Sequence, residues 1–293
     1  MAIEDEITLI DVTARDGLQD AEGFVPLDAK LALLRGVAEA GFKMVEATSF
    51  VHPRWVPKLA DADEVYDGVR DIPGVEWIAL VPNRRGFERA LAHRVQSITV
   101  VCSASDAHNR ANLNRSREET LHELGELVVE AHRHQVRVRG AISTAFDCPF
   151  SGPVALGEVM AVAEAYLEMG VDEMSLADTL GTANPKSVGQ RVRALNQIRG
   201  RTPLSLHLHD RFGWALANVA MALEAGVEHL ECALGGLGGC PFAPGAAANL
   251  DAERLIPFLE AMGIRTGIDL EKVREVREAL WVVLEQRLPI PAV

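Results

Sequence analysis

The stretch Pro203-Leu-Ser-Leu-His-Leu-His-Asp210 is typical of a buried β-strand that ends in metal-binding side chains. Side chains in a strand alternate between its two faces, so His207 and His209 point to one side and the leucine between them points to the other. Two neutral imidazoles held side by side on rigid backbone form half of a metal site. A pair of hydrogen-bonded core histidines is the alternative. The sequence His-x-His-Asp at the carboxyl end of an apolar strand favours the metal.

Apolar runs of strand length recur along the whole chain, with segments of helical spacing between them. Strands are expected at residues 7–12, 44–48, 76–81, 97–102, 138–143, 173–177, 204–209 and 230–233. Helices are expected at residues 27–40, 116–133, 155–169, 186–198 and 214–225, with shorter ones near 61–69 and 87–91. A further helix is expected at 269–288.

Three glycines mark a weak internal repeat. Gly41, Gly170 and Gly226 each follow a predicted helix and precede a short predicted strand, which is typical of a left-handed helix cap. Eight β–α units without a break in composition predict an α/β fold of the (β/α)₈ TIM barrel type. We expect one domain over residues 1–293, with the barrel at 5–265 and a C-terminal helical extension at 266–293. A doubly wound sheet is the alternative, but it rarely needs eight parallel strands.

Composition and charge exclude several classes of function. Of the 293 residues, 48% are hydrophobic, which is enough to bury a large core, and the net charge of −13 argues against a nucleic-acid partner. Because no stretch of roughly eighteen apolar residues occurs, we expect no membrane span. The acidic N-terminus resembles neither a signal nor a transit peptide, so the expected location is the cytoplasm and the four cysteines are expected to be reduced.

Polar residues follow several of the predicted strands, where a parallel barrel places its catalytic groups. They are Arg15, Asp16, Glu46 and Asp178, together with the two histidines. Asp16 and the histidines supply one oxygen and two nitrogens, a set that suits Mg²⁺, Mn²⁺, Co²⁺ or Zn²⁺. Arg15 has the planar fork that holds a carboxylate or a developing enolate oxygen. A surface ion pair between Arg15 and Asp16 is the alternative.

A glycine-rich segment, Gly235-Gly-Leu-Gly-Gly-Cys240, follows the last predicted strand. Four glycines in five positions suit a loop that closes over a ligand, and Cys240 at its tip could donate a proton once the loop shuts. A tight connection with an incidental thiol is the alternative. Two locally basic segments, a loop at 108–117 and the point 83–85, suggest either a phosphorylated ligand or solvated charge.

Several motifs together resemble one known family. They are Arg15-Asp-Gly-Leu-Gln19, Glu46-Ala-Thr-Ser-Phe-Val51, Trp55-Val-Pro57, Val81-Pro-Asn83, Asp178-Thr, His207-Leu-His-Asp210 and Gly236-Leu-Gly-Gly-Cys-Pro-Phe-Ala243 with Gly245 and Asn249-Leu. Over residues 7–277 the chain resembles the 3-hydroxy-3-methylglutaryl-CoA lyases, which are metal-dependent lyase barrels. The resemblance implies a retro-Claisen cleavage of an acyl-CoA thioester to acetyl-CoA and acetoacetate.

The resemblance also implies a role for each matching residue. The metal, Mg²⁺ or Mn²⁺ with Co²⁺ or Zn²⁺ as alternatives, would be held by Asp16, His207, His209 and Asn249. Arg15 would steady the enolate, and Cys240 would be the acid of the mobile loop. Supporting carboxylates would be Glu46, Asp178 and Glu253, and the substrate would contact Arg15, Gln19 and Asn83. A homodimer is a possible assembly.

Three segments depart from the family pattern. Asp11-Val-Thr-Ala14 stands where the family usually has Glu-Val-Gly-Pro, and the stretches 143–148 and 103–108 also differ. The acyl group therefore stays open, with citramalyl-CoA or a longer 3-hydroxyglutaryl-CoA as alternatives. Two further alternatives are a condensing enzyme on the same barrel and a barrel that only binds or scaffolds.

Overall fold

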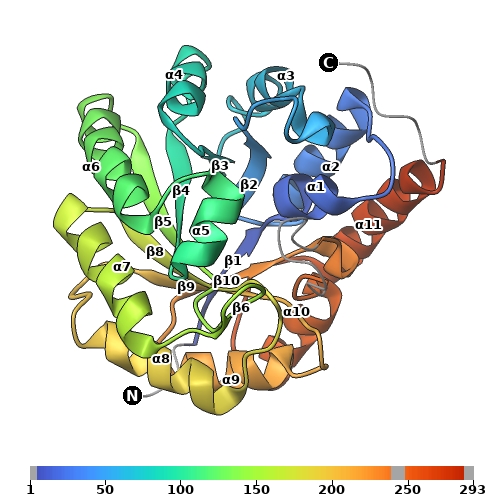
Figure 1. Cartoon of the computed structure of the whole chain (residues 1–293). Helices are drawn as coiled ribbons and strands as arrows, with labels where there is room; N and C mark the ends of the chain where they lie inside the picture. The colour runs from blue at the N-terminus through green and yellow to red at the C-terminus, as the bar shows by residue number, and fades with distance from the viewer. Residues whose placement is uncertain (1–4, 239–247, 287–293) are drawn as a thin grey trace.

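Eight parallel strands close into a barrel in the computed structural model, which describes residues 5–238 and 248–286 (Figure 1). The strands are β1 (Thr8–Asp11), β2 (Met44–Ser49), β3 (Glu76–Leu80), β4 (Ser97–Ser103), β5 (Arg137–Ser143), β8 (Glu173–Asp178), β9 (Leu204–Leu208) and β10 (His229–Cys232). Their order around the barrel is β1-β10-β9-β8-β5-β4-β3-β2. The predicted (β/α)₈ barrel and all eight predicted strands are confirmed.

Helices surround this barrel, as Figure 1 shows. They are α2 (Leu27–Glu39), α3 (Ala62–Asp67), α4 (Arg84–Ala92), α6 (Arg117–Arg133), α7 (Leu156–Met169), α8 (Pro185–Asn196), α9 (Ala215–Ala225), α10 (Ala252–Ala261) and α11 (Leu270–Leu284). The last of these is the expected C-terminal helix, and it packs against α2 so closely that a Cβ on Gly36 would meet Val276. Of the helices in the described ranges, none has the length and apolar character needed to cross a membrane.

Two helices and a hairpin differ from the prediction. The basic segment expected as a loop at 108–117 is largely helical, in α5 (Asp106–Leu113), which begins with a Ser105 cap and ends at Asn114 with a φ of 56°. Because its residues are mostly polar, no apolar stripe at helical spacing indicated a helix there. Helix α10 was also missed, and it carries Pro257 in its interior. The short antiparallel strands β6 (Asp147–Cys148) and β7 (Gly152–Pro153) lie in the connection after β5.

The three glycine caps are confirmed. Gly41, Gly170 and Gly226 have φ angles of 107°, 79° and 97°, a region that L side chains rarely adopt. Each glycine therefore ends its helix and turns the chain back into the next strand.

The inner faces of several strands are charged rather than apolar at one level of the barrel. Arg139 on β5 is buried at 1% exposure and donates to Glu173 on β8 at 3.1 Å and to Glu231 on β10 at 2.8 Å. Its guanidinium also donates to the hydroxyls of Ser205 and Thr99. Five strands thus meet around one guanidinium inside the barrel, because β4, β5, β8, β9 and β10 each contribute a side chain.

Substitution of Gly140 by alanine should destabilise the barrel. An added Cβ would lie 2.6 Å from the ring of Tyr166, which is buried in α7 and donates its hydroxyl to the carbonyl of Ala141. Overpacking of this kind costs roughly 1–3 kcal/mol, so the melting temperature should fall by several degrees. The control is Gly157→Ala in α7, the helix that carries Tyr166, where no atom lies within 4 Å of the new Cβ. Equal melting temperatures for the two variants would contradict the packing described here.

Candidate metal centre

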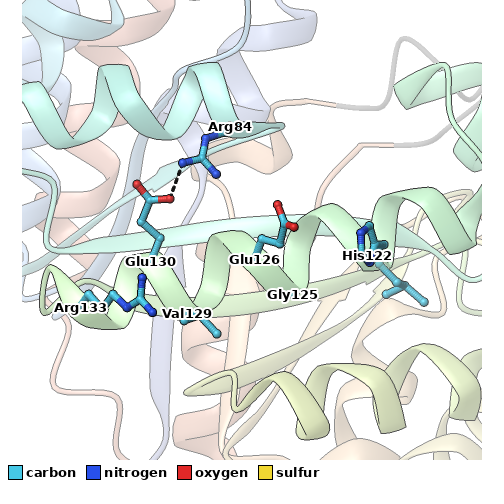
Figure 2. Close-up of a pocket in the computed structure, with 8 residues that line it drawn as sticks. Arg84, His122, Gly125, Glu126, Val129, Glu130 and Arg133 are labelled. Atoms are coloured by element: carbon cyan, nitrogen blue, oxygen red, sulfur yellow. Dashed lines mark hydrogen bonds and ion pairs between the residues drawn. The ribbon is translucent and has the colours of Figure 1, made fainter.

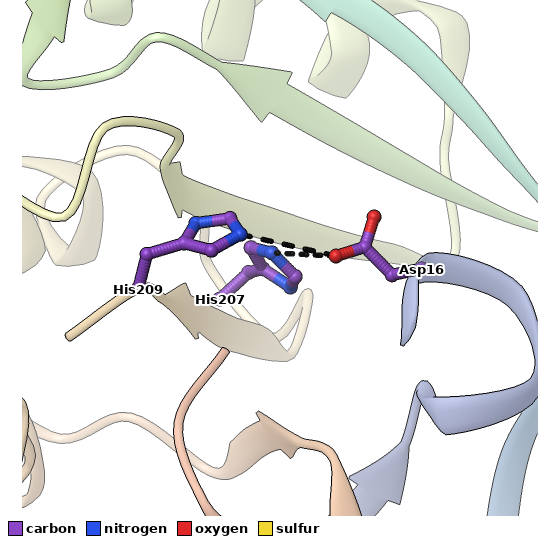
Figure 3. A group of neighbouring side chains, drawn as sticks. All are labelled: Asp16, His207 and His209. Carbon is purple, nitrogen blue, oxygen red and sulfur yellow. Dashed lines mark ion pairs between the residues drawn. The ribbon is translucent and has the colours of Figure 1, made fainter. Parts of the chain in front are cut away.

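Asp16, His207 and His209 come together at the carboxyl ends of β1 and β9 (Figure 3). One ligand atom from each lies within 4.8 Å of the other two. The Oδ2 atom of Asp16 is 3.9 Å from Nε2 of His207 and 3.8 Å from Nε2 of His209, and all three residues are buried. Asp16 lies in a π-helical turn, Thr13–Gly17, that directly follows β1. The predicted clustering of these three residues is thus present in the structure.

Both imidazole rings are held by their Nδ1 atoms. Nδ1 of His209 lies 2.9 Å from the backbone carbonyl oxygen of Asp178, and Nδ1 of His207 lies 2.9 Å from Oε2 of Glu231. Since a carbonyl or carboxylate oxygen only accepts, each Nδ1 carries a proton, and in the neutral ring Nε2 then keeps its lone pair. These lone pairs belong to the atoms that face Asp16, which is the arrangement that a metal requires.

Asn249 also lies at the metal cluster, on a backbone segment that runs beside His209. Residues 249 and 209 form an antiparallel bridge, and the amide Nδ2 donates to Oδ2 of Asp16 at 2.8 Å and to the carbonyl of Leu237 at 2.9 Å. Its Oδ1 is buried and has no hydrogen-bond partner among the residues that the structure describes. Asn249 was predicted as a ligand only through the family resemblance, because the sequence around it has no pattern that places it on the barrel rim.

The donor set fits a divalent cation. Two buried atoms, Nε2 of His209 and Oδ1 of Asn249, lack hydrogen-bond partners within the described ranges, and both are good ligand atoms. With the Asp16 carboxylate and His207 they offer two oxygens and two imidazole nitrogens, a mixture compatible with Mg²⁺, Mn²⁺ or Zn²⁺.

Arg15 lies beside the cluster between two carboxylates. Its Nε donates to Glu46 on β2 and its Nη1 donates to Asp16. Burial acts to raise the pKa of Asp16, but the adjacent Arg15 guanidinium is the largest opposing influence, and that pKa lies well below its ordinary value. Asp16 is therefore ionised at neutral pH, as a metal ligand must be. Arg15, Asp16 and Glu46 thus lie next to one another, as the sequence predicts.

Two other predicted carboxylates lie in different surroundings. The Asp178 carboxylate accepts hydrogen bonds from the backbone amides of Thr182 and Ala183 at 3.1 and 3.0 Å. The contact of Asp178 with His209 is made by its backbone carbonyl oxygen instead. Burial raises the pKa of Asp178 to about 6, although these hydrogen bonds act to lower it. Glu253 accepts from Arg277 at 2.8 Å and thereby joins α10 to α11.

The remaining predicted site residues either belong to local structure away from the metal ligands or lie outside the residues that the structure describes. The side chain of Asn83 caps α4 by accepting from the amide of Gly86 at 3.0 Å. Gln19 is half-buried in the short helix α1 (Leu18–Asp20) next to the π-helical turn. Cys240 falls outside the described residues. Cys102 and Cys232 are buried in β4 and β10.

The glycine segment begins against the metal cluster. Gly235, Gly236 and Gly238 all have positive φ angles. A Cβ on Gly238 would lie 2.5 Å from Nδ2 of Asn249 and 2.9 Å from Cα of Gly17. Glycine is therefore required here by a close approach to the site, in addition to any freedom that it gives the loop.

Several arginines of the two basic segments are paired with acidic residues. Arg84 pairs with Glu130 at 2.7 Å in a hollow on the outer side of α4 and α6 (Figure 2), and none of the residues lining that hollow belongs to the metal cluster. Arg110 pairs with Asp106 at 2.7 Å, and Arg117 pairs with Glu158. These acidic partners favour solvated ion pairs over a phosphate site.

The departure at residues 11–14 is explained by a hydrogen-bonded pair that the sequence did not reveal. The Asp11 carboxylate accepts from the amide of Thr13 at 3.1 Å and from its hydroxyl at 2.7 Å. The same hydroxyl accepts from the amide of Leu234 at 2.9 Å, next to the glycine segment. The shortened acid and the added hydroxyl therefore satisfy each other and tie β1 to the base of the loop.

Asp11 should make the free energy of unfolding depend on pH. Burial raises its pKa from 3.8 to about 7, although the hydrogen bonds from Thr13 act to lower it. The folded state therefore binds this proton more tightly than the unfolded state, so the stability that Asp11 contributes is greatest at low pH and is lost as the pH rises from about 4 to about 7. The slope contributed by this one group is at most about 1.4 kcal/mol per pH unit.

Urea denaturation at several pH values checks this expectation. The Asp11→Asn variant lacks the titrating group, so its stability should fall less than that of the wild type between pH 4.5 and 7.5. Parallel pH profiles for the two proteins would show that Asp11 titrates at an ordinary value.

Comparisons with known proteins agree with this geometry. The family model described as HMGL-like matches residues 6–280. A hydroxymethylglutaryl-CoA lyase of Bacillus subtilis is 38% identical over 287 residues, covering 98% of this chain and 95% of that protein. The mitochondrial hydroxymethylglutaryl-CoA lyase of Homo sapiens is 36% identical, covering 96% of this chain and 86% of its own length.

A solved structure gives the same result. An HMG-CoA lyase from Acinetobacter baumannii, in complex with coenzyme A and 3-methylmalate, superposes with a TM-score of 0.92 at 36% identity. The match covers 100% of this chain and 95% of that one. Sequence, fold and site therefore agree that the chain belongs to the HMGL-like family.

Proposed function

We propose that this protein cleaves 3-hydroxy-3-methylglutaryl-CoA to acetyl-CoA and acetoacetate and requires a divalent cation. The observation that carries the proposal is the meeting of Asp16, His207 and His209 at the barrel rim with Arg15 beside them. The relatives named above are lyases of this substrate over nearly the whole chain. When bound, the cation would supply Lewis-acid chemistry, which makes a hydroxyl easier to deprotonate.

Arg15 is suited to charge that develops during C–C bond cleavage. Its bonds to Glu46 and Asp16 use Nε and Nη1 and fix the plane of the guanidinium. This leaves Nη2 for an oxygen of the substrate, at a side chain that is 12% exposed. A donor held rigidly before the reaction stabilises the enolate without reorganising, and such a donor acts mainly on the transition state.

The three sequence departures leave this site intact. Asp11 and Thr13 bond to each other and to Leu234. Ser103 bonds to His108 and to Ser143, both at 2.7 Å, at the ends of β4 and β5. None of these contacts replaces a member of the metal cluster. The acyl group proposed is that of the relatives.

Two further parts of the proposal rest on the family resemblance. Cys240 would protonate the enolate when the glycine segment lies over the substrate, and a hydroxyl or water would be a poorer acid in its place. The protein would act with Mg²⁺ or Mn²⁺, on a thioester of coenzyme A.

The direct test is an assay of protein stripped by chelator, with and without Mg²⁺ or Mn²⁺. We expect equimolar acetyl-CoA and acetoacetate only when the cation is restored. Citramalyl-CoA and a longer 3-hydroxyglutaryl-CoA serve as competing substrates in the same assay. Cleavage of one of these with a higher kcat/KM would mean that this thioester is the substrate. Full activity without any cation would refute the proposal.

Replacement of Arg15 by lysine should lower kcat about 10²-fold or more and change KM only a few-fold. An ammonium cannot bond Glu46 and Asp16 and still present a planar donor to the substrate. Steady-state kinetics check this, with Arg110→Lys as a control at an exposed arginine. A near-native kcat for Arg15→Lys would mean that the residue serves only as an ion-pair partner.

A further inference from the structure

The two histidines of the metal cluster are held by different partners. His209 is held by a neutral backbone carbonyl, that of Asp178, whereas His207 is held by the buried carboxylate of Glu231. Figure 3 shows both rings presenting a nitrogen to Asp16. One ligand is therefore anchored by a charge and the other by a dipole.

Glu231 divides its two oxygens between different tasks. Oε2 lies 2.9 Å from Nδ1 of His207, while Oε1 accepts from Nη2 of Arg139 at 2.8 Å and from the hydroxyl of Ser175 at 2.7 Å. Glu231 and His207 are paired in register on adjacent strands, and Glu231 is 5% exposed. Its carboxylate has thus no freedom to turn without breaking a charged hydrogen bond.

Arg139 is in turn fixed from several strands. Its Nε donates to Glu173 at 3.1 Å, and its two terminal nitrogens donate to Thr99 and Ser205 at 3.3 and 3.1 Å. The guanidinium balances the charge that Glu231 brings into the barrel. An unbroken chain of contacts therefore runs from the barrel interior to a ligand of the metal.

We propose that Glu231 is a positioning residue that fixes the tautomer and ring orientation of His207, and that Arg139 holds Glu231 in that role. This inference rests on the proposed metal site. By accepting from Nδ1, Glu231 keeps the proton off Nε2 and leaves that lone pair for the cation. A carboxylate acceptor also makes the imidazole a stronger donor to the metal than a carbonyl would.

The Glu231→Gln variant tests the proposal with nearly unchanged shape. Arg139 and Ser175 both donate to the Oε1 position, so they will hold the amide oxygen there and turn the amide NH₂ toward His207. Nδ1 must then accept, which moves the imidazole proton to Nε2 and removes the lone pair. We expect the affinity for Mn²⁺ to fall about 10–100-fold, measured by calorimetry.

The tautomer is read independently in metal-free protein by ¹⁵N NMR of labelled histidines. At a pH where the ring is neutral, we expect His207 to carry its proton on Nδ1 in the wild type and on Nε2 in Glu231→Gln. A wild-type His207 protonated only on Nε2 would overturn the inference even if the variant failed to fold. Native Mn²⁺ affinity in a folded Glu231→Gln variant would overturn it too.

The matched control is Glu173→Gln, the same chemical change at the other carboxylate that pairs with Arg139. Its melting temperature is expected to fall, but its Mn²⁺ affinity should stay within about twofold of the wild type, with the His207 tautomer unchanged. Equal losses of affinity in both variants would mean that Glu231 acts through stability alone, which contradicts the proposal. Absence of Mn²⁺ binding in the wild type would instead refute the proposed function, while the tautomer measurement would still decide the role of Glu231.

Discussion

Closure of the barrel is the constraint on which the site depends. Strand β1 pairs with both β2 and β10, and β10 pairs with β9, so the first and seventh strands of the barrel lie on either side of β10. Only this pairing brings Asp16 to His207 and His209 from the far end of the chain. Because side chains alternate along a strand, a slip of one residue in β9 would turn both imidazoles out of the barrel. The fold thus sets the ligand geometry through its register.

Charge inside the barrel ties stability to the chemistry above it. Burying Arg139 is costly unless its partners are also charged and well placed, and Glu173 and Glu231 meet that requirement. Glu231 then serves the His207 ring with its second oxygen. The Glu231 carboxylate therefore takes part both in the buried ion pair with Arg139 and in the contact with His207, so a substitution at Glu231 should change both the stability of the fold and the binding of the metal.

The sequence revealed those parts of the molecule that have a periodic or local signal. Alternating apolar runs predicted the strands, glycine caps predicted their connections, and strand ends predicted Asp16 and the two histidines. Helices α5 and α10 were missed because one is polar and the other contains a proline. Glu231 was missed although a glutamate in an apolar strand was visible, because its partner His207 is defined only by the register. Asn249 came from the family resemblance alone.

The central claim is that Asp16, His207 and His209 hold a divalent cation, and X-ray absorption spectroscopy of the Mn²⁺-loaded protein tests it most directly. The account predicts a first shell of oxygen and nitrogen ligands with the multiple-scattering signature of two imidazoles, and loss of one imidazole in His209→Ala. A shell made of oxygen alone in the wild type, unchanged in that variant, would contradict the claim.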